Sequence, residues 1–132
     1  MKSSLKELAH TRQWIAEKAK QAGLSDEAIF DLQVVINEAC SNVIKHAYRM
    51  ENGHEIMLSV VIDSDKIALT VRDLGDKIDL KRYRLPNLDV PSESGYGVFM
   101  IRNLMDIVEY DISHELGTEL KMVKFRQEVK DG

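Results

Sequence analysis

The sequence predicts an α+β fold, a two-layer sandwich in which helices cover one face of a sheet. Three observations favour this fold. The first part of the chain carries apolar residues at steps of three and four, as an amphipathic helix does. Two later parts each contain a pair of strand-like runs separated by a turn signal. The resulting order of helix, helix, strand, strand, loop, helix, strand and strand suits helices stacked on a single sheet.

Two helices are predicted in the first part of the chain. Residues 4–22 form the first helix, because their apolar side chains share one face and Gly23 follows as a C-cap. Ser25 is the expected N-cap of the second helix, which ends near the turn signal at residues 51–53. The amphipathic stripe of this second helix consists of Ile29, Leu32, Ile36, Cys40, Val43 and Ala47.

Four strands are predicted in two hairpins. They cover residues 55–63, 66–73, 107–113 and 118–126. The first hairpin turns at Ser64 and Asp65, and the second turns at residues 115–117. Between the hairpins, residues 73–97 hold both prolines and three of the seven glycines. A loop of this length inside a compact domain usually has a function. Residues 98–106, which follow it, are predicted to form a short helix.

Composition limits the possible classes of protein. The length of 132 residues fits a single domain spanning 1–132. Eighteen basic and 22 acidic residues give a formal net charge of −4 without a basic cluster, so neither nucleic acid nor a membrane is expected as a partner. Cys40 is the only cysteine, which suits a reducing compartment. Since the chain shows neither a signal-peptide core nor a bilayer-spanning run, we expect it in the cytoplasm.

Polar residues interrupt the second helix beside its apolar face. Glu38, Asn42 and His46 follow one another at intervals of four, and Asp31 and Lys45 are expected on the same side. One interpretation is a solvated helix face, and another is that Glu38 and Lys45 neutralise each other. The functional interpretation is chemical. An amide oxygen can complete the coordination of Mg²⁺, and a nearby carboxylate can accept a hydroxyl proton.

Three further clusters each have a structural and a functional interpretation. Asp73 and Gly75 form either an ordinary β-turn, in which the glycine supplies a positive φ, or a carboxylate presented into a pocket. Gly95 and Gly97 lead into a helix, where their N–H groups can cradle phosphate oxygens or simply allow a tight entry. Thr118 either belongs to a hairpin turn or points its hydroxyl into a pocket.

Taken together and in order, these motifs resemble one family. NEACSNVIKHAY is similar to the N box of the GHKL (histidine-kinase-like) ATPases, DLGD to their G1 box, GYGVFMIRNLMD to their G2 box and GT to their closing glycine-threonine pair. The residues of the N box and of the G2 helix are most similar to those of the bacterial anti-sigma factor serine/threonine-protein kinases of partner-switching systems. The resemblance covers the chain from about Leu5 to Phe125.

The resemblance implies the Bergerat fold, with helices on one face of a mixed sheet and ATP between the helical layer and a lid loop. It makes Glu38 the general base that acts on a substrate serine, and Asn42 the ligand of Mg²⁺. The implied nucleotide-binding residues are Asn42, Lys45, His46, Asp73, Gly75, Gly95, Gly97 and Thr118. Among these, Asp73 would accept a hydrogen bond from the adenine amino group. Arg12 would lie on the partner-binding face.

The function that the resemblance implies is an ATP-dependent protein serine/threonine kinase that also sequesters a sigma factor. It would release the sigma factor on engaging a small STAS-type antagonist, which it phosphorylates, and it would be a homodimer. One alternative is a non-catalytic, ATP-dependent binding module of the same fold. Another is the detached catalytic domain of a histidine kinase, but His10 lacks the surrounding phosphoacceptor motif.

The sequence departs from the family pattern in three ways. Two departures favour the non-catalytic alternative, and the third concerns the edge of the sheet. Lys77 stands where the fuller G1 pattern has a second glycine, and Glu93 stands where some members have a basic residue. An acid facing a γ-phosphate is repulsive. The chain also opens almost directly into a helix, so we expect the sheet to lack an edge strand or to gain one from a partner.

Two kinds of residue receive a structural interpretation only. Cys40 is expected in the core as a small hydrophobic residue. His54 and His114 lack neighbours at metal-ligand spacing, so the sequence predicts no zinc site.

Overall fold

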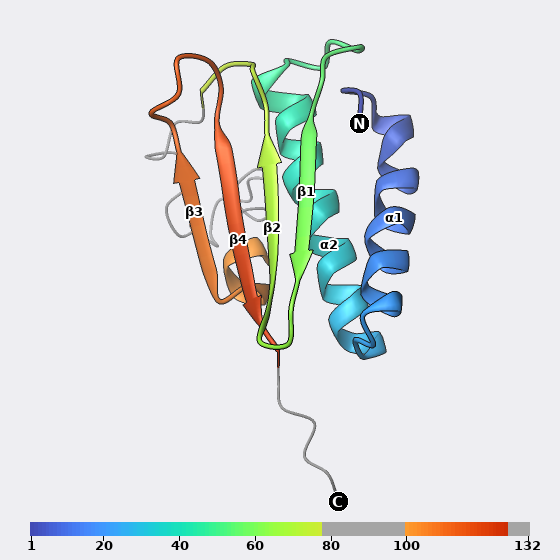
Figure 1. Cartoon of the computed structure of the whole chain (residues 1–132). Coiled ribbons are helices and arrows are strands. Elements are labelled where there is room, and N and C mark those ends of the chain that lie inside the picture. Colours follow the sequence, from blue (N-terminus) through green and yellow to red (C-terminus); the bar gives the residue numbers. More distant parts are fainter. Residues whose placement is uncertain (78–99, 127–132) are drawn as a thin grey trace, which may run out of the picture.

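The computed structural model describes residues 1–77 and 100–126 (Figure 1). In these ranges the chain forms helices and a four-stranded sheet, as predicted. The elements are α1 (Leu8–Gln21), α2 (Asp26–Asn42), β1 (Met57–Ile62), β2 (Lys66–Arg72), β3 (Ile107–Asp111) and β4 (Glu119–Phe125). Residues 100–104 are also helical, which confirms the described part of the short helix expected there.

The helix ends follow the local signals of the sequence. Ser25 Oγ accepts a hydrogen bond from the Ala28 N–H at 3.1 Å, so it caps α2 as expected. Asp26 and Glu27 occupy the first turn of α2, where negative charge is favourable. Gly23, after α1, has a φ of +79°, the left-handed conformation typical of a helix C-terminus.

The helical segment does not end at Asn42 but widens into a π-helical turn over Val43–Ala47. The Tyr48 N–H donates to the Val43 carbonyl at 3.0 Å, five residues back. Arg49 and Met50 follow with φ of +50° and +66°, which is unusual for residues other than glycine. The helical segment thus ends at Ala47, shortly before the predicted turn at 51–53, and its last turn is wider than a spacing of about 100° per residue assumes.

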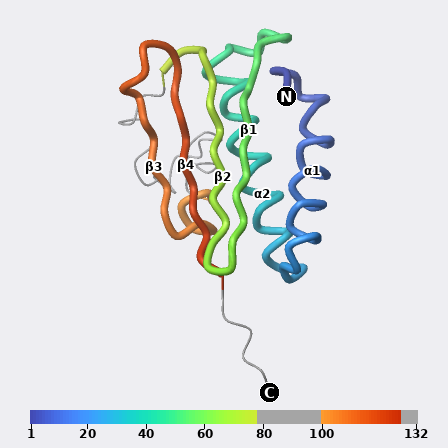
Figure 2. Tube along the Cα trace, viewed as in Figure 1, coloured from blue at the N-terminus to red at the C-terminus, as the bar shows by residue number. Residues whose placement is uncertain are grey.

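The sheet has the strand order β1-β2-β4-β3 (Figure 2). All three pairings are antiparallel, so the expected mixed sheet is antiparallel throughout its described part. Two hairpins build it, and the second places Asp111 of β3 directly opposite Glu119 of β4. The first hairpin turns at residues 63–65, which include the predicted Ser64 and Asp65, and the Asp63 side chain accepts hydrogen bonds from the N–H groups of Asp65 and Lys66.

The core lies between α2 and one face of the sheet, with α1 packed along α2 (Figure 1). Its most deeply buried large side chains include Ile15, Leu32, Val35, Ile36, Ile44, Ile67, Leu69, Val71 and Met122. Cys40 is fully buried among them, and burial raises the pKa of its thiol to about 12. Its predicted role as a core hydrophobic residue is confirmed.

A short N-terminal segment lies along the sheet edge that the sequence led us to expect bare. The Ile56 N–H donates to the Met1 carbonyl at 2.9 Å, and the Ser3 N–H donates to the His54 carbonyl at 2.7 Å. Lys2 and Glu55 lie opposite each other in an antiparallel bridge, and their side chains form an ion pair. The expected gap is thus partly filled by the first three residues of the chain, next to the residues that precede β1.

Candidate functional site

A cavity of about 300 Å³ opens between the end of α2 and the adjacent ends of β2 and β4. Four of the predicted site residues line it, namely Asn42, His46, Asp73 and Thr118. Its described lining consists of Ala39, Asn42, Val43, His46, Ala47, Arg49, Val71, Asp73, Asp76, Lys77, Tyr110, Thr118 and Leu120. The chain therefore brings three separate motifs of the sequence to one place.

One side of the cavity is the helical wall, formed by Ala39, Asn42, Val43, His46 and Ala47. These residues recur at steps of three and four, so they share one face of α2 and of the π-helical turn that continues it. Two of the three residues of the predicted polar stripe, Asn42 and His46, therefore line the cavity.

The other residues assigned to that stripe lie elsewhere. Glu38 and Lys45 are half-buried and do not belong to the described lining of the cavity. Within the described part of the chain no ion pair joins them, so mutual neutralisation is wrong as an explanation. Asp31 was expected on the same side, but its carboxylate pairs with Lys124 of β4 at 3.6 Å, away from the cavity.

The opposite side is the strand-end wall, formed by Val71, Asp73, Thr118 and Leu120. Asp73 is only 2% exposed, and its Oδ1 accepts a hydrogen bond from the Gly75 N–H at 3.0 Å. Its own N–H donates to the Thr118 carbonyl at 3.1 Å. Burial raises the pKa of the Asp73 carboxyl, and hydrogen bonds from the backbone of Gly75 and Thr118 oppose this rise. The result is a buried acid held in place by backbone groups on a cavity wall.

Two glycines make this wall possible. A Cβ on Gly75 would lie 2.3 Å from the Ala47 carbonyl oxygen, and a Cβ on Gly117 would lie 2.1 Å from that of Asp73. Gly117 also has a φ of +71°, whereas Gly75 does not have a positive φ. The positive φ expected of Gly75 is therefore wrong, although the Asp73 side chain does hold the chain there. The glycine is needed instead for the close passage of two backbones.

Tyr48 joins the two walls, and it was not among the residues predicted for the site. Its hydroxyl accepts a hydrogen bond from the Leu74 N–H at 2.8 Å and donates to the Glu55 carbonyl at 2.6 Å. Its ring is buried and stacks on His54 with ring centroids 4.6 Å apart. Its position at the end of the apolar stripe could have predicted its burial. A buried tyrosine needs hydrogen-bond partners for its hydroxyl, so contacts of this kind were to be expected.

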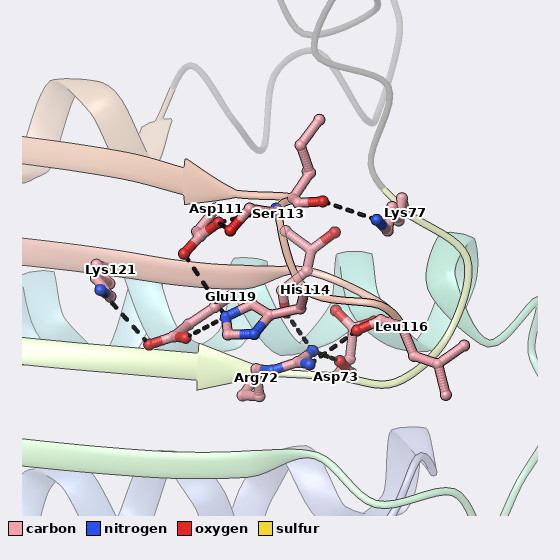
Figure 3. Close-up of polar contacts among 11 residues, drawn as sticks. Arg72, Asp73, Lys77, Asp111, Ser113, His114, Leu116, Glu119 and Lys121 are labelled. Atoms are coloured by element: carbon pink, nitrogen blue, oxygen red, sulfur yellow. Dashed lines mark hydrogen bonds and ion pairs between the residues drawn. The ribbon is translucent and has the colours of Figure 1, made fainter.

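Basic residues fix the loop between β3 and β4 against the strand-end wall (Figure 3). The Arg72 guanidinium donates to the carbonyls of Asp73 and of Leu116, the latter at 2.8 Å. Lys77 Nζ donates to the Ile112 carbonyl at 2.8 Å. Lys77, the predicted departure from the glycine pattern, thus attaches the segment after β2 to this loop and lines the cavity.

The remaining predicted residues fall in two groups. Arg12 donates from Nη1 to Asn37 Oδ1 at 2.5 Å, and Gln33 Nε2 donates to the Arg12 carbonyl at 3.3 Å, so Arg12 connects α1 to α2 rather than standing free. Gly95 and Gly97, together with the departure at Glu93, lie outside the described residues.

Comparison with known proteins identifies the family of the chain. The family described as the histidine kinase-like ATPase domain matches residues 1–124. The chain belongs to this family. The match confirms the resemblance seen in the four motifs, and it extends over the N-terminal segment and both hairpins.

Relatives within the family are similar over most of their length. The serine-protein kinase RsbW of Bacillus licheniformis is 32% identical over 124 residues, covering 86% of this chain and 76% of that protein. The protein of the same name from Listeria monocytogenes serovar 1/2a is 34% identical over 118 residues, covering 83% of this chain and 74% of that protein.

Solved structures of histidine kinases share the fold. The histidine kinase domain of a blue-light activated kinase from Erythrobacter litoralis superposes with a TM-score of 0.56 at 18% identity, covering 74% of this chain and 44% of that one. The mycobacterial sensor histidine kinase MprB superposes with a TM-score of 0.53 at 16% identity, covering 74% of this chain and 71% of that one. In the part of the chain that the structure describes, no helix has the length and apolar character needed to cross a bilayer.

Proposed function

We propose that this chain binds ATP in the cavity between α2 and the strand ends, and that it is a serine-protein kinase. The observation that carries the proposal is the buried carboxylate of Asp73 on the wall of a cavity that Asn42 and Thr118 also line. A perturbed acid that converges with other polar groups on one cavity is typical of a small-molecule site. Family membership makes ATP the expected occupant.

The strand-end wall suits an adenine ring. Gly75 already occupies Asp73 Oδ1, and a buried carboxylate favours a further donor such as the exocyclic amino group of the base. Val71, Leu120 and Ala47 supply apolar surface on the same cavity for the ring itself. Asp73 would thus orient the base, while Gly117 and Thr118 hold the backbone that keeps Asp73 in place.

The helical wall suits Mg²⁺ and phosphate. Mg²⁺ in nucleotide sites takes one or two protein oxygens and completes its shell with phosphate and water. The amide oxygen of Asn42 on the cavity wall fits this requirement, and the bound ion would neutralise charge that develops on the phosphates. Lys77 and His46 line the same cavity and add basic groups, as does Arg49, which pairs there with Asp76 at 2.6 Å. Lys45, next to His46, and the glycines Gly95 and Gly97 are proposed to complete the phosphate environment.

Glu38 is the proposed general base. It lies one helical turn before Asn42 on α2, so a serine hydroxyl near the phosphates would be within reach of its carboxylate. Arg12 is bonded to Asn37, the residue that precedes Glu38. A partner that docks on Arg12 would therefore lie beside the base, which supports Arg12 as part of the partner-binding face.

The partners proposed for this face are a sigma factor and a STAS-type antagonist protein. In this scheme the chain sequesters the sigma factor in the cytoplasm as a homodimer and phosphorylates the antagonist on serine. The serine-protein kinases that resemble the chain over most of its length support this assignment.

One observation favours a non-catalytic, ATP-dependent binding module instead. Glu38 does not belong to the described lining of the cavity, so its carboxylate would not face a nucleotide bound there. In that case ATP would only set the shape of the partner-binding face.

Calorimetric titration with ATP, with and without Mg²⁺, tests the nucleotide site. We expect Mg²⁺-dependent binding by the wild type and a loss of about tenfold or more in Asp73→Asn, because the amide lacks the charge that attracts the adenine amino group. Asp65→Asn, in the exposed turn between β1 and β2, is the matched control and should bind as the wild type does. Absence of ATP binding by the wild type would rule out both functions.

A phosphotransfer assay separates the kinase from the binding module. Wild-type protein incubated with labelled ATP and a STAS-domain protein should label a serine of that protein. Glu38→Gln should bind ATP with unchanged affinity and transfer no phosphate, because only the proton acceptor is removed. ATP binding without transfer by the wild type would favour the module.

A further inference from the structure

Three metal-ligating side chains meet at the end of the second hairpin, outside the cavity. Asp111 ends β3, Glu119 begins β4, and His114 lies in the loop between them (Figure 3). One ligand atom from each of the three lies within 4.8 Å of the others. None of the three lines the cavity or takes part in the proposed phosphoryl transfer.

The strand register brings two negative charges together here. Asp111 and Glu119 are direct partners across the β3–β4 pairing, and like charges in this position destabilise a sheet. Arg72 is the partner of Glu119 on the other side, but its guanidinium donates to the carbonyls of Asp73, Leu116 and Thr118. Within the described chain no ion pair joins Arg72 to Glu119. The two carboxylates face His114, and Glu119 also faces Lys121, so a divalent cation between them would relieve the repulsion that remains.

Each carboxylate presents one oxygen to His114 and has the other engaged elsewhere. Asp111 Oδ1 accepts hydrogen bonds from the N–H of Ser113 at 2.9 Å and from its hydroxyl at 2.6 Å. Glu119 Oε1 faces the ammonium of Lys121 at 3.8 Å. The other two oxygens face His114 Nε2. Glu119 Oε2 is hydrogen-bonded to it at 2.8 Å, and Asp111 Oδ2 lies 3.6 Å from it. Outer partners that orient the ligands in this way are typical of metal sites.

The separations of the two carboxylate oxygens from His114 Nε2 suit a small divalent ion. Zinc binds imidazole nitrogen and carboxylate oxygen at about 2.0–2.2 Å, which places neighbouring ligands of a tetrahedral shell about 3.3 Å apart. The two separations at His114 Nε2, 2.8 Å and 3.6 Å, lie on either side of this value. An imidazole among the ligands favours zinc and similar transition metals over Mg²⁺ or Ca²⁺.

We propose that Asp111, His114 and Glu119 form a binding site for a divalent transition-metal ion of the zinc class, with water in the fourth position. The site is distinct from the Mg²⁺ position at Asn42 and does not depend on the proposed kinase activity. The ion would tie the middle of the loop to the ends of both strands. The same loop carries Leu116, which Arg72 holds, and Gly117 and Thr118, which pack against Asp73.

Zn²⁺ titration of the full chain without an affinity tag, in competition with a chromogenic chelator, tests this site. We expect one equivalent of Zn²⁺ to bind the wild type and His114→Ala to bind it more than about 100-fold more weakly. Ser113→Ala should bind about tenfold more weakly, since it loses one bond that orients Asp111. Excess Mg²⁺ should not displace the zinc.

His54→Ala is the matched control. His54 Nε2 lies 3.0 Å from Glu51 Oε2, an exposed histidine–glutamate pair with no third ligand among the described clusters. Its loss should leave zinc affinity unchanged. Glu119→Gln, which keeps the shape of the side chain, serves as a second test in case His114→Ala disturbs folding as seen by circular dichroism. Equal zinc affinity in the wild type, His114→Ala and Glu119→Gln would overturn the proposal. Failure of the wild type to bind one equivalent of Zn²⁺ in competition with the chelator would also overturn it.

Discussion

The two walls of the cavity are assembled in different ways. The helical wall comes from one continuous segment, in which regular spacing alone places Asn42 and His46 on the same face. The strand-end wall joins segments more than forty positions apart, and backbone contacts between Asp73, Gly117 and Thr118 hold it together. Side chains of the helical wall are therefore replaceable one at a time, whereas a change in the strand-end wall affects fold and site together.

The largest expected effect is that of a methyl group on the strand-end wall. Gly117→Ala would place a Cβ 2.1 Å from the Asp73 carbonyl oxygen at a φ of +71°. We expect the free energy of unfolding to fall by at least about 3 kcal/mol, since backbone atoms cannot give way as a flexible side chain does. Urea unfolding monitored by circular dichroism measures this loss.

Gly53→Ala provides the comparison for that measurement. Gly53 has a φ of +90°, but a Cβ there would meet nothing within 4 Å. Its replacement should cost about 1 kcal/mol through backbone strain alone. Equal losses for the two variants would mean that the strand-end wall relaxes freely, and the contrast between the walls would be wrong.

The second effect concerns Tyr48, the residue that joins the walls. Tyr48→Phe removes the hydroxyl that bonds the Leu74 N–H and the Glu55 carbonyl, so both backbone groups lose a partner. We expect a loss of about 2 kcal/mol in the free energy of unfolding. His54→Ala removes the stacked ring and its exposed contact with Glu51, and it should cost less than about 1 kcal/mol. The reverse order would show that stacking, rather than the hydroxyl, connects the walls.

The helical wall should respond in function rather than in stability. Asn42→Ala changes a half-buried side chain on the cavity face of α2, so the free energy of unfolding should change by no more than about 0.5 kcal/mol. The Mg²⁺-dependent part of the ATP affinity should disappear. Asn103 is an exposed residue in the helical stretch 100–104, and Asn103→Ala should keep both the stability and the Mg²⁺-dependent ATP affinity of the wild type. Retained Mg²⁺ dependence in Asn42→Ala would place the ion elsewhere.

The smallest effect is the pH dependence that Asp73 contributes. Its burial raises the pKa of the carboxyl above the ordinary value of 3.8, so the folded state binds more protons than the unfolded state just above that value. The contribution of Asp73 to the free energy of unfolding therefore declines as pH rises through this window.

Asp73→Asn removes that titration while keeping a side-chain oxygen for the Gly75 N–H. The stability of this variant relative to the wild type should increase from acidic to neutral pH, as measured by urea unfolding at a series of pH values. A difference that does not change with pH would indicate that the Asp73 carboxyl titrates normally.

Local signals in the sequence predicted much of the fold. The cap at Ser25, the two hairpins and the helical stripe depend on residues near one another in the chain, and all three are present. The family motifs predicted Asn42 and Thr118 as residues of one site, and both line the cavity.

What could not be predicted depends on register and on distant contacts. No sequence spacing indicates that Asp31 faces Lys124, or that Ala47 passes so close to residue 75 that only glycine fits. His114 lacks neighbours at metal-ligand spacing, yet the β3–β4 register places two carboxylates beside it. The π-helical turn likewise has no local signature, because the contacts of Tyr48 with Leu74 and Glu55 stabilise it from outside the helix.

The position of Cys40 has a practical consequence. It is the only cysteine of the chain, it is fully buried, and its neighbour Ala39 lines the cavity. A thiol shielded in this way reacts with an alkylating reagent only when the surrounding helix opens. The rate of Cys40 alkylation therefore measures how often α2 opens, and no label has to be introduced. A ligand that fills the cavity should lower this rate.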